Sequence, residues 1–153
     1  MNSFLKELFD YNQHMNQKFI DAFSANPTKI SEKSIKLMSH ILNAHQIWNN
    51  RIDSEEPLFG VWQMQRLENF TEIDQTNHDK TFNILEEFNA TSLINYTSSK
   101  GEPFKNSIQE IIFHVLNHST YHRGQISAEL RNSGIDPLIS DYIFYKREMN
   151  LNM

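Results

Sequence analysis

Three of the seven histidines, His114, His118 and His122, are spaced four residues apart. Side chains at this spacing on an α-helix project from one face about one turn apart, so two imidazoles could hold one metal ion. On a helical wheel, His118 and His122 lie nearer than His114 to the apolar stripe that contains Ile112 and Ile126. The spacing therefore favours His118 and His122 as a ligand pair, with His114 better placed for a supporting hydrogen bond.

The pair does not form the zinc-protease signature, because no Glu follows His118 to act as a general base. Two histidines at this spacing also occur by chance, so a metal site needs a third ligand. An earlier segment offers His40 and His45. These two are five residues apart, or about 140° around a helix, so both cannot face one metal ion. The wheel leaves the choice between them open.

Composition narrows the class of protein. With 39% hydrophobic and 22% charged residues, the chain has the balance of a folded globular protein. A formal net charge of −5 disfavours nucleic acid as a partner. The absence of Cys excludes disulfides and thiolate ligands, so any thiol chemistry would need a cosubstrate. Neither a leader peptide nor a membrane-spanning run is evident, and we predict a cytoplasmic protein without a membrane partner.

Only four Gly and four Pro interrupt the chain, and apolar residues between them recur at helical spacing. The pattern predicts four long helices and a short last one, with these approximate bounds: residue 4 to before Asn26, Ser31 to before Pro57, Thr71 to Phe88, Ser107 to Asn132 or Ser133, and 141–149. Residues 55–70 lack periodicity and are predicted to form a loop with at most a short helical turn. We predict one all-α domain over residues 1–153, a four-helix bundle.

Local signals mark the ends of these elements. Ser31 and Thr71 are suitable N-caps, and Ser107-Ile-Gln-Glu110 reads as a capping box. Gly134 follows the longest helix where a left-handed turn is needed. Before that helix, residues 93–96 and 103–104 flank a turn at Gly101, which predicts a small β-hairpin.

Several other residues carry expectations of their own. Gly124, inside a helix, costs about 1 kcal/mol relative to Ala, which predicts close approach of another helix. Arg123 is expected to pair with a carboxylate of the first helix or of a partner subunit, or to meet an anionic substrate. His14 is predicted to be a surface residue and His78 a packed one. Trp48 and Trp62 are most simply core residues.

The longest predicted helix contains the run His114-Val-Leu-Asn-His118-Ser-Thr-Tyr-His122-Arg-Gly-Gln-Ile126, followed by Leu130-Arg-Asn-Ser-Gly134, Pro137 and Asp141. This run resembles the last-helix motif of the DinB/YfiT-like family of damage-inducible four-helix-bundle proteins. The upstream run from His40 to Trp48 and Arg51 is similar to that family's second-helix motif. The resemblance covers nearly the whole chain. It implies a metal site built from His40, His118 and His122. His45 stands where members often carry an acidic residue, so the resemblance favours His40 over His45.

The same resemblance implies zinc or nickel as the metal cofactor, a homodimer, and a small-molecule substrate. Three neutral imidazoles with a fourth position open are typical of a catalytic site. Some relatives use bacillithiol, mycothiol or glutathione, which predicts a transferase that activates a low-molecular-weight thiol. Two alternatives remain: a metal-dependent hydrolase, and a non-catalytic metal-binding stress-response protein. A protein group closing the fourth position, such as Asp141, Tyr142 or Tyr145, would favour the non-catalytic reading.

Overall fold

The computed structural model describes residues 2–151, so the first and the last two residues of the predicted domain lie outside it. Over these described residues the all-α prediction is confirmed, with five α-helices and one antiparallel hairpin. Their bounds are α1 Asn2–Ala25, α2 Glu32–Ile52, α3 Phe70–Glu87, β1 Leu93–Thr97, β2 Pro103–Ser107, α4 Ile108–Asn132 and α5 Tyr142–Leu151, with a short 3₁₀ turn, η1, over Leu67–Asn69. The single-domain assignment stays a prediction.

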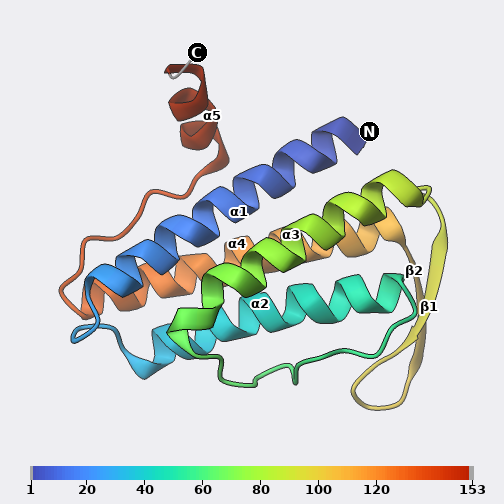
Figure 1. The fold of residues 1–153 in the computed structure, drawn as a ribbon, viewed down its shortest axis with the longest axis horizontal. Coiled ribbons are helices and arrows are strands. Elements are labelled where there is room, and N and C mark those ends of the chain that lie inside the picture. The colour runs from blue at the N-terminus through green and yellow to red at the C-terminus, as the bar shows by residue number, and fades with distance from the viewer. Residues whose placement is uncertain (1, 152–153) are drawn as a thin grey trace.

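The four long helices lie side by side as a bundle (Figure 1). Helix α2 packs along α3 and α4, and α1 packs along the same two helices from the other side. Helices α2 and α3 run in the same direction, because residues 53–66 return along the length of the bundle between them (Figure 1). This connection is the crossover of the bundle, whereas the hairpin lies in the connection between α3 and α4. The segment 53–66 is called the crossover segment below.

The predicted helix starts are mostly confirmed by their hydrogen bonds. Ser31 caps α2 through a bond of 3.1 Å from the Ser34 backbone N–H. Ser107 and Glu110 form the predicted capping box of α4. The predicted Thr71 cap is wrong, because η1 runs directly into α3 and the Leu67 carbonyl accepts the first N–H instead.

Two apolar clusters make up the core, one toward each end of the bundle. The first contains Phe9, Ile52, Ile84 and Ile112, and the second contains Phe19, Leu42, Phe70 and Ile126. On each helix, buried polar residues lie between the residues of these two clusters. They are Asn12, Asn16, His45, Asn49, Asp74, Asn77, Thr81, Ser119 and Arg123. This buried polar layer crosses the middle of the bundle, and its members bond mainly to one another, as buried polar groups must.

Gly124 does not mark a close approach of two helices, so that prediction is wrong. It lies on the exposed side of α4, and a Cβ built there would meet nothing within 4 Å. Nothing in the structure explains the glycine. Gly134, by contrast, has a φ of +72°, the left-handed conformation predicted after α4.

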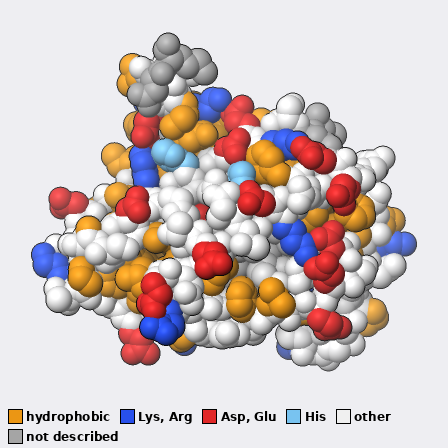
Figure 2. Space-filling model, viewed as in Figure 1, with side chains coloured by type: hydrophobic (Ala, Val, Ile, Leu, Met, Phe, Trp, Pro, Cys, Tyr) orange, Lys and Arg blue, Asp and Glu red, His pale blue; other side chains and the backbone are white. Residues whose placement is uncertain are grey.

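The surface carries both signs of charge. Lys and Arg side chains are scattered among Asp and Glu on the face shown in Figure 2, where no continuous basic area is seen. Within residues 2–151, no helix is long and apolar enough to cross a membrane.

Candidate metal centre

The structure brings His40, His118 and His122 together. His40 comes from the middle of α2, and the other two come from adjacent turns of α4, which packs against α2. One nitrogen of each ring lies within 4.8 Å of the others. The ring centroids of His118 and His122 are 4.4 Å apart, and each lies 4.7 Å from that of His40. In the described chain, these three residues form the only such group of potential metal ligands.

Hydrogen bonds at two of the rings, those of His40 and His122, determine which nitrogen carries the proton. The Nδ1 of His40 lies 3.0 Å from the carbonyl of Val61, and the Nδ1 of His122 lies 2.7 Å from Oε1 of Gln125. Both oxygens only accept, so each Nδ1 must donate and each Nε2 keeps its lone pair. Metal-binding histidines are typically oriented by such a bond from the other ring nitrogen.

For His118 and His40, burial favours the neutral form of the ring, which is the ligating form of imidazole. Burial, followed by the neighbouring rings of His122 and His40, lowers the pKa of His118 to about 3. Burial also lowers the pKa of His40. The Nε2 atoms of His40 and His118 are 2.9 Å apart, slightly less than the roughly 3.3 Å expected between two nitrogens bound to tetrahedral zinc. The donor set therefore fits a divalent ion of intermediate softness with only small ring movements.

The crossover segment covers this cluster. Trp62 stacks on the His40 ring at a centroid distance of 3.7 Å and an angle of 5°. Polar side chains along one face of α2 hold the backbone of the segment: Ser39 accepts from the Gln65 N–H, Asn43 donates to the Gln63 carbonyl, and Asn50 donates to the Glu56 carbonyl. Trp62 is thus half exposed beside the site and is not the core residue predicted from its type.

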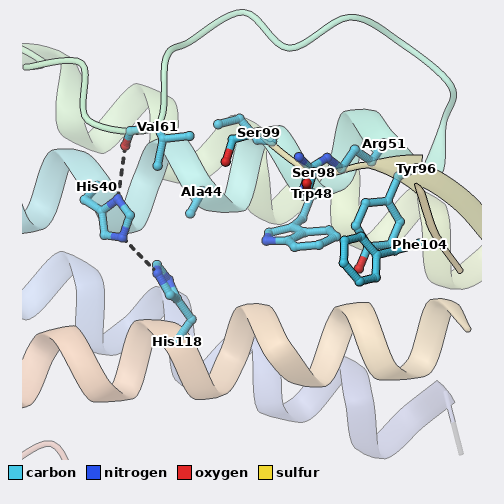
Figure 3. A pocket seen from close by; sticks show the side chains of 11 residues that line it. His40, Ala44, Trp48, Arg51, Val61, Tyr96, Ser98, Ser99, Phe104 and His118 are labelled. Atoms are coloured by element: carbon cyan, nitrogen blue, oxygen red, sulfur yellow. Dashed lines mark hydrogen bonds between the residues drawn. The ribbon is translucent and has the colours of Figure 1, made fainter. Parts of the chain in front are cut away.

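A cavity of about 350 Å³ opens directly beside the cluster (Figure 3). One wall is a face of α2, with Ala44, Trp48 and Arg51 following His40 along the helix. The hairpin closes the far end with Tyr96 and Phe104, and Val61 and His118 border the near end (Figure 3). The hairpin was predicted, but its position over a cavity was not.

His45 points away from the cluster, into the buried polar layer. Its Nε2 lies 2.8 Å from Oγ1 of Thr81 on α3, and its ring packs on Phe9 of α1. The choice between His40 and His45, left open by the helical wheel, is thereby decided in favour of His40 as the residue beside His118. Burial, and then the charge of His78, lower the pKa of His45 to about 3.

This pKa makes a prediction for acid stability. Between about pH 6.5 and pH 3, the unfolded chain binds a proton at His45 that the folded chain does not. Buried His45 therefore carries no protonation cost at neutral pH, and the free energy of unfolding falls as the pH drops through that window, by about 1.4 kcal/mol per pH unit. Urea unfolding of the metal-free protein at pH 6.0, 5.0 and 4.0 should show a steeper loss for wild type than for His45→Gln. Equal slopes would contradict the prediction.

The remaining histidines are outside the cluster. His114 is exposed, and its ring contacts Trp48 and His118. Among the described residues, no hydrogen bond joins His114 to the cluster, so the predicted supporting bond is wrong. His78 packs on Phe82, as predicted. His14 is half-buried under α5, against Tyr145, and not on the open surface as predicted.

The C-terminal helix does not close the site. Tyr142 and Lys146 bond to Glu7 of α1, and Tyr145 packs on Tyr11 of the same helix. Helix α5 therefore lies on α1, away from α2 (Figure 1). Among residues 2–151, no carboxylate joins the three imidazoles.

These features define a class: a helical bundle whose second and fourth long helices present three histidines to a cavity. The family model described as the DinB family matches residues 1–150, and the chain belongs to that family. A curated relative named Protein DinB, from Bacillus subtilis (strain 168), is 25% identical over an alignment of 165 residues that covers 95% of each protein.

Proposed function

We propose that this protein binds a zinc or nickel ion at His40, His118 and His122 and acts as a transferase that activates a low-molecular-weight thiol. The observation that carries the proposal is the cluster itself: three imidazoles at the edge of a cavity, two of them with their Nε2 lone pairs set by hydrogen bonds. Membership of the DinB family agrees with a metal-binding role.

The residues around the cluster have distinct tasks in this proposal. A bound divalent ion would favour the thiolate form of a thiol in the open position. The Val61 carbonyl and Gln125 keep the rings of His40 and His122 oriented, which preserves a rigid donor set. Trp62 shields the face of His40 from water. The cavity then receives the rest of the thiol and its co-substrate.

A transferase is favoured over a hydrolase by the lining of the cavity. No Asp or Glu of the described chain lines it, so a water molecule there has no carboxylate base. A transferase whose nucleophile is already a thiolate does not need one. The homodimer and the stress-response role implied by the family resemblance remain predictions.

The first test is metal content. Protein purified without a polyhistidine tag, incubated with zinc or nickel and desalted, should retain about one ion per chain by elemental analysis. In His118→Ala the affinity should fall by more than about 100-fold, since a ligand is lost outright. His114→Ala is the matched control, because His114 is on the same helix but outside the cluster, and it should retain the ion.

Absence of metal from the wild type would contradict the proposal, as would equal retention by His118→Ala. Thiol activation is tested separately with the cobalt-substituted protein. Adding glutathione should produce a sulfur-to-metal charge-transfer band in the near ultraviolet, absent in His118→Ala. Stoichiometric metal without such a band, for glutathione and for bacillithiol, would contradict the transferase and favour a non-catalytic metal protein.

A further inference from the structure

Arg51 is a cation in the cavity wall without a carboxylate partner. Among residues 2–151, the structure shows no ion pair for it. Within the described part of the chain, the guanidinium makes one hydrogen bond, from Nη2 to the carbonyl of Thr97 on β1, and this bond is long at 3.5 Å. An arginine has five N–H donors and remains protonated at neutral pH even when partly buried. Most of the donors of Arg51 are therefore available to a ligand.

Aromatic rings hold this guanidinium in place. Its Cζ atom lies 4.4 Å from the centre of the Trp48 ring and 5.1 Å from that of Tyr96. These contacts orient the guanidinium over the rings at little further entropic cost, which favours binding by a preorganised group. Figure 3 shows Arg51 at the end of the cavity near Trp48 and Tyr96, while His40 and His118 lie at the other end.

The face of α2 sets the distance between the two ends. His40, Ala44, Trp48 and Arg51 share this face, because Ala44, Trp48 and Arg51 follow His40 by four, eight and eleven positions. Eleven residues correspond to about 16 Å along the helix axis, which is the separation of the two residues' backbone positions. Ala44 has the smallest side chain of the four and leaves the floor between the ends clear (Figure 3).

The charge of the cavity decides what it takes. The protein as a whole carries a net charge of −5, yet within the described residues the cavity lining contains one cation and no carboxylate. A guanidinium presents two parallel N–H groups that match a carboxylate. The rings of Trp48, Tyr96 and Phe104 supply apolar surface beside it. A neutral or cationic ligand would leave the arginine unpaired.

We propose that the cavity binds an organic carboxylate, whose charged end lies on Arg51 and whose apolar body lies against Trp48 and Tyr96. The inference rests on the proposed function in one respect, since it takes this cavity, beside the proposed metal site, as the place where the substrate binds. It then names the class of substrate: an anionic molecule long enough to extend from Arg51 toward His40. Arg51 is the residue that determines this specificity.

The test compares two ligands of the same shape, 3-phenylpropionate and its uncharged amide, 3-phenylpropionamide. Isothermal titration calorimetry on the full-length, metal-free protein measures both affinities. The carboxylate is expected to bind at least about tenfold more tightly, since only the carboxylate brings an opposite charge to the paired N–H groups of the guanidinium. In Arg51→Met the two ligands should bind within about twofold of each other, and Arg51→Lys should show an intermediate preference.

Arg66→Met is the matched control, because Arg66 is an exposed arginine at the end of the crossover segment, outside the cavity. It should keep the wild-type preference. Equal binding of acid and amide by the wild type would overturn the inference, as would no binding of either at millimolar concentration, or a preference that survives in Arg51→Met.

Because the calorimetry uses metal-free protein, its outcome does not depend on whether the proposed metal site is correct. A preference that depends on Arg51 supports the carboxylate site even if no metal is retained in the elemental analysis. Conversely, one metal ion per chain without any preference for the acid would overturn the inference and leave the metal proposal standing.

Discussion

Replacing Arg123 with Met is expected to lower the free energy of unfolding by about 2–6 kcal/mol, since it leaves two buried acceptors unpaired at a cost of about 1–3 kcal/mol each. The side chain of Arg123 is 0% exposed. Its Nη1 donates to Oδ1 of Asn12 at 2.6 Å and of Asn16 at 2.8 Å, both on α1. Met fills similar space and leaves these two acceptors unpaired inside the bundle.

A second charge in the same layer increases the loss. Asn16 and Gln17 donate to the two oxygens of Asp74 on α3, each at 2.7 Å. Burial raises the pKa of Asp74 to about 6, while the bonds from Asn16 and Gln17 and the charge of Arg123 oppose that rise. Without Arg123, the carboxylate at pH 7 has no buried cation in its network.

This network can be tested with a double-mutant cycle in urea at pH 7, using metal-free protein. Asp74→Asn removes the second charge, so Arg123→Met should cost less in that background by about 0.5–3 kcal/mol, the range measured for residues that share a network. Arg131→Met, an exposed arginine two turns further along α4, should change stability by no more than about 0.5 kcal/mol. A cost below 1 kcal/mol for Arg123→Met would contradict the structural role.

The pattern of helices was predictable because it depends on local physics. Periodicity and caps such as Ser31 and the Ser107–Glu110 box act within one or two turns, and the structure confirms them. The pairing of His118 with His122 is equally local, since residues four apart on a helix lie together wherever the helix packs.

The third histidine was not predictable from the wheel, because its choice depends on packing between helices. Both His40 and His45 are buried, at 6% and 2% exposure, so burial alone does not separate them. His45 bonds to Thr81 of α3, whereas His40 faces α4. Only the family resemblance favoured His40 in advance.

The positions of Trp62 and the Val61 carbonyl beside His40 were not predicted, because the crossover segment has no periodicity from which to place its residues. One signal was present in the sequence. Ser39, Asn43, Gln46 and Asn50 form a polar stripe within an otherwise apolar helix, at spacings of four, three and four. Such a stripe indicates that a segment with unpaired backbone groups lies along that face, and in the structure the stripe bonds to the backbone of the crossover segment.

Arg123 shows a similar limit. Contact with the first helix was one of the alternatives predicted for Arg123, but the predicted partner was a carboxylate and the observed partners are two amides. The buried carboxylate of Asp74 comes from α3 and is linked to Arg123 through Asn16. A single sequence does not reveal a link that requires three helices to meet.

Metal binding should raise the free energy of unfolding, because the three histidines come together only when α2 packs against α4. At a free zinc concentration 1,000 times the dissociation constant, the free energy of unfolding is expected to rise by about 4.1 kcal/mol, provided that the unfolded chain does not bind zinc. The reason is geometric: His40 lies 78 residues before its partner His118, so the three rings meet only when α2 and α4 are packed.

Urea unfolding with and without zinc measures this gain, and a chelator should reverse it. The gain should disappear in His118→Ala and persist in His114→Ala, because only the former removes a ring from the cluster. A gain of equal size in His118→Ala would place the stabilising zinc outside the cluster. If the wild type retains zinc but gains no stability, the unfolded chain must bind the ion as tightly as the folded chain does. That result would contradict a site that forms only when α2 packs against α4.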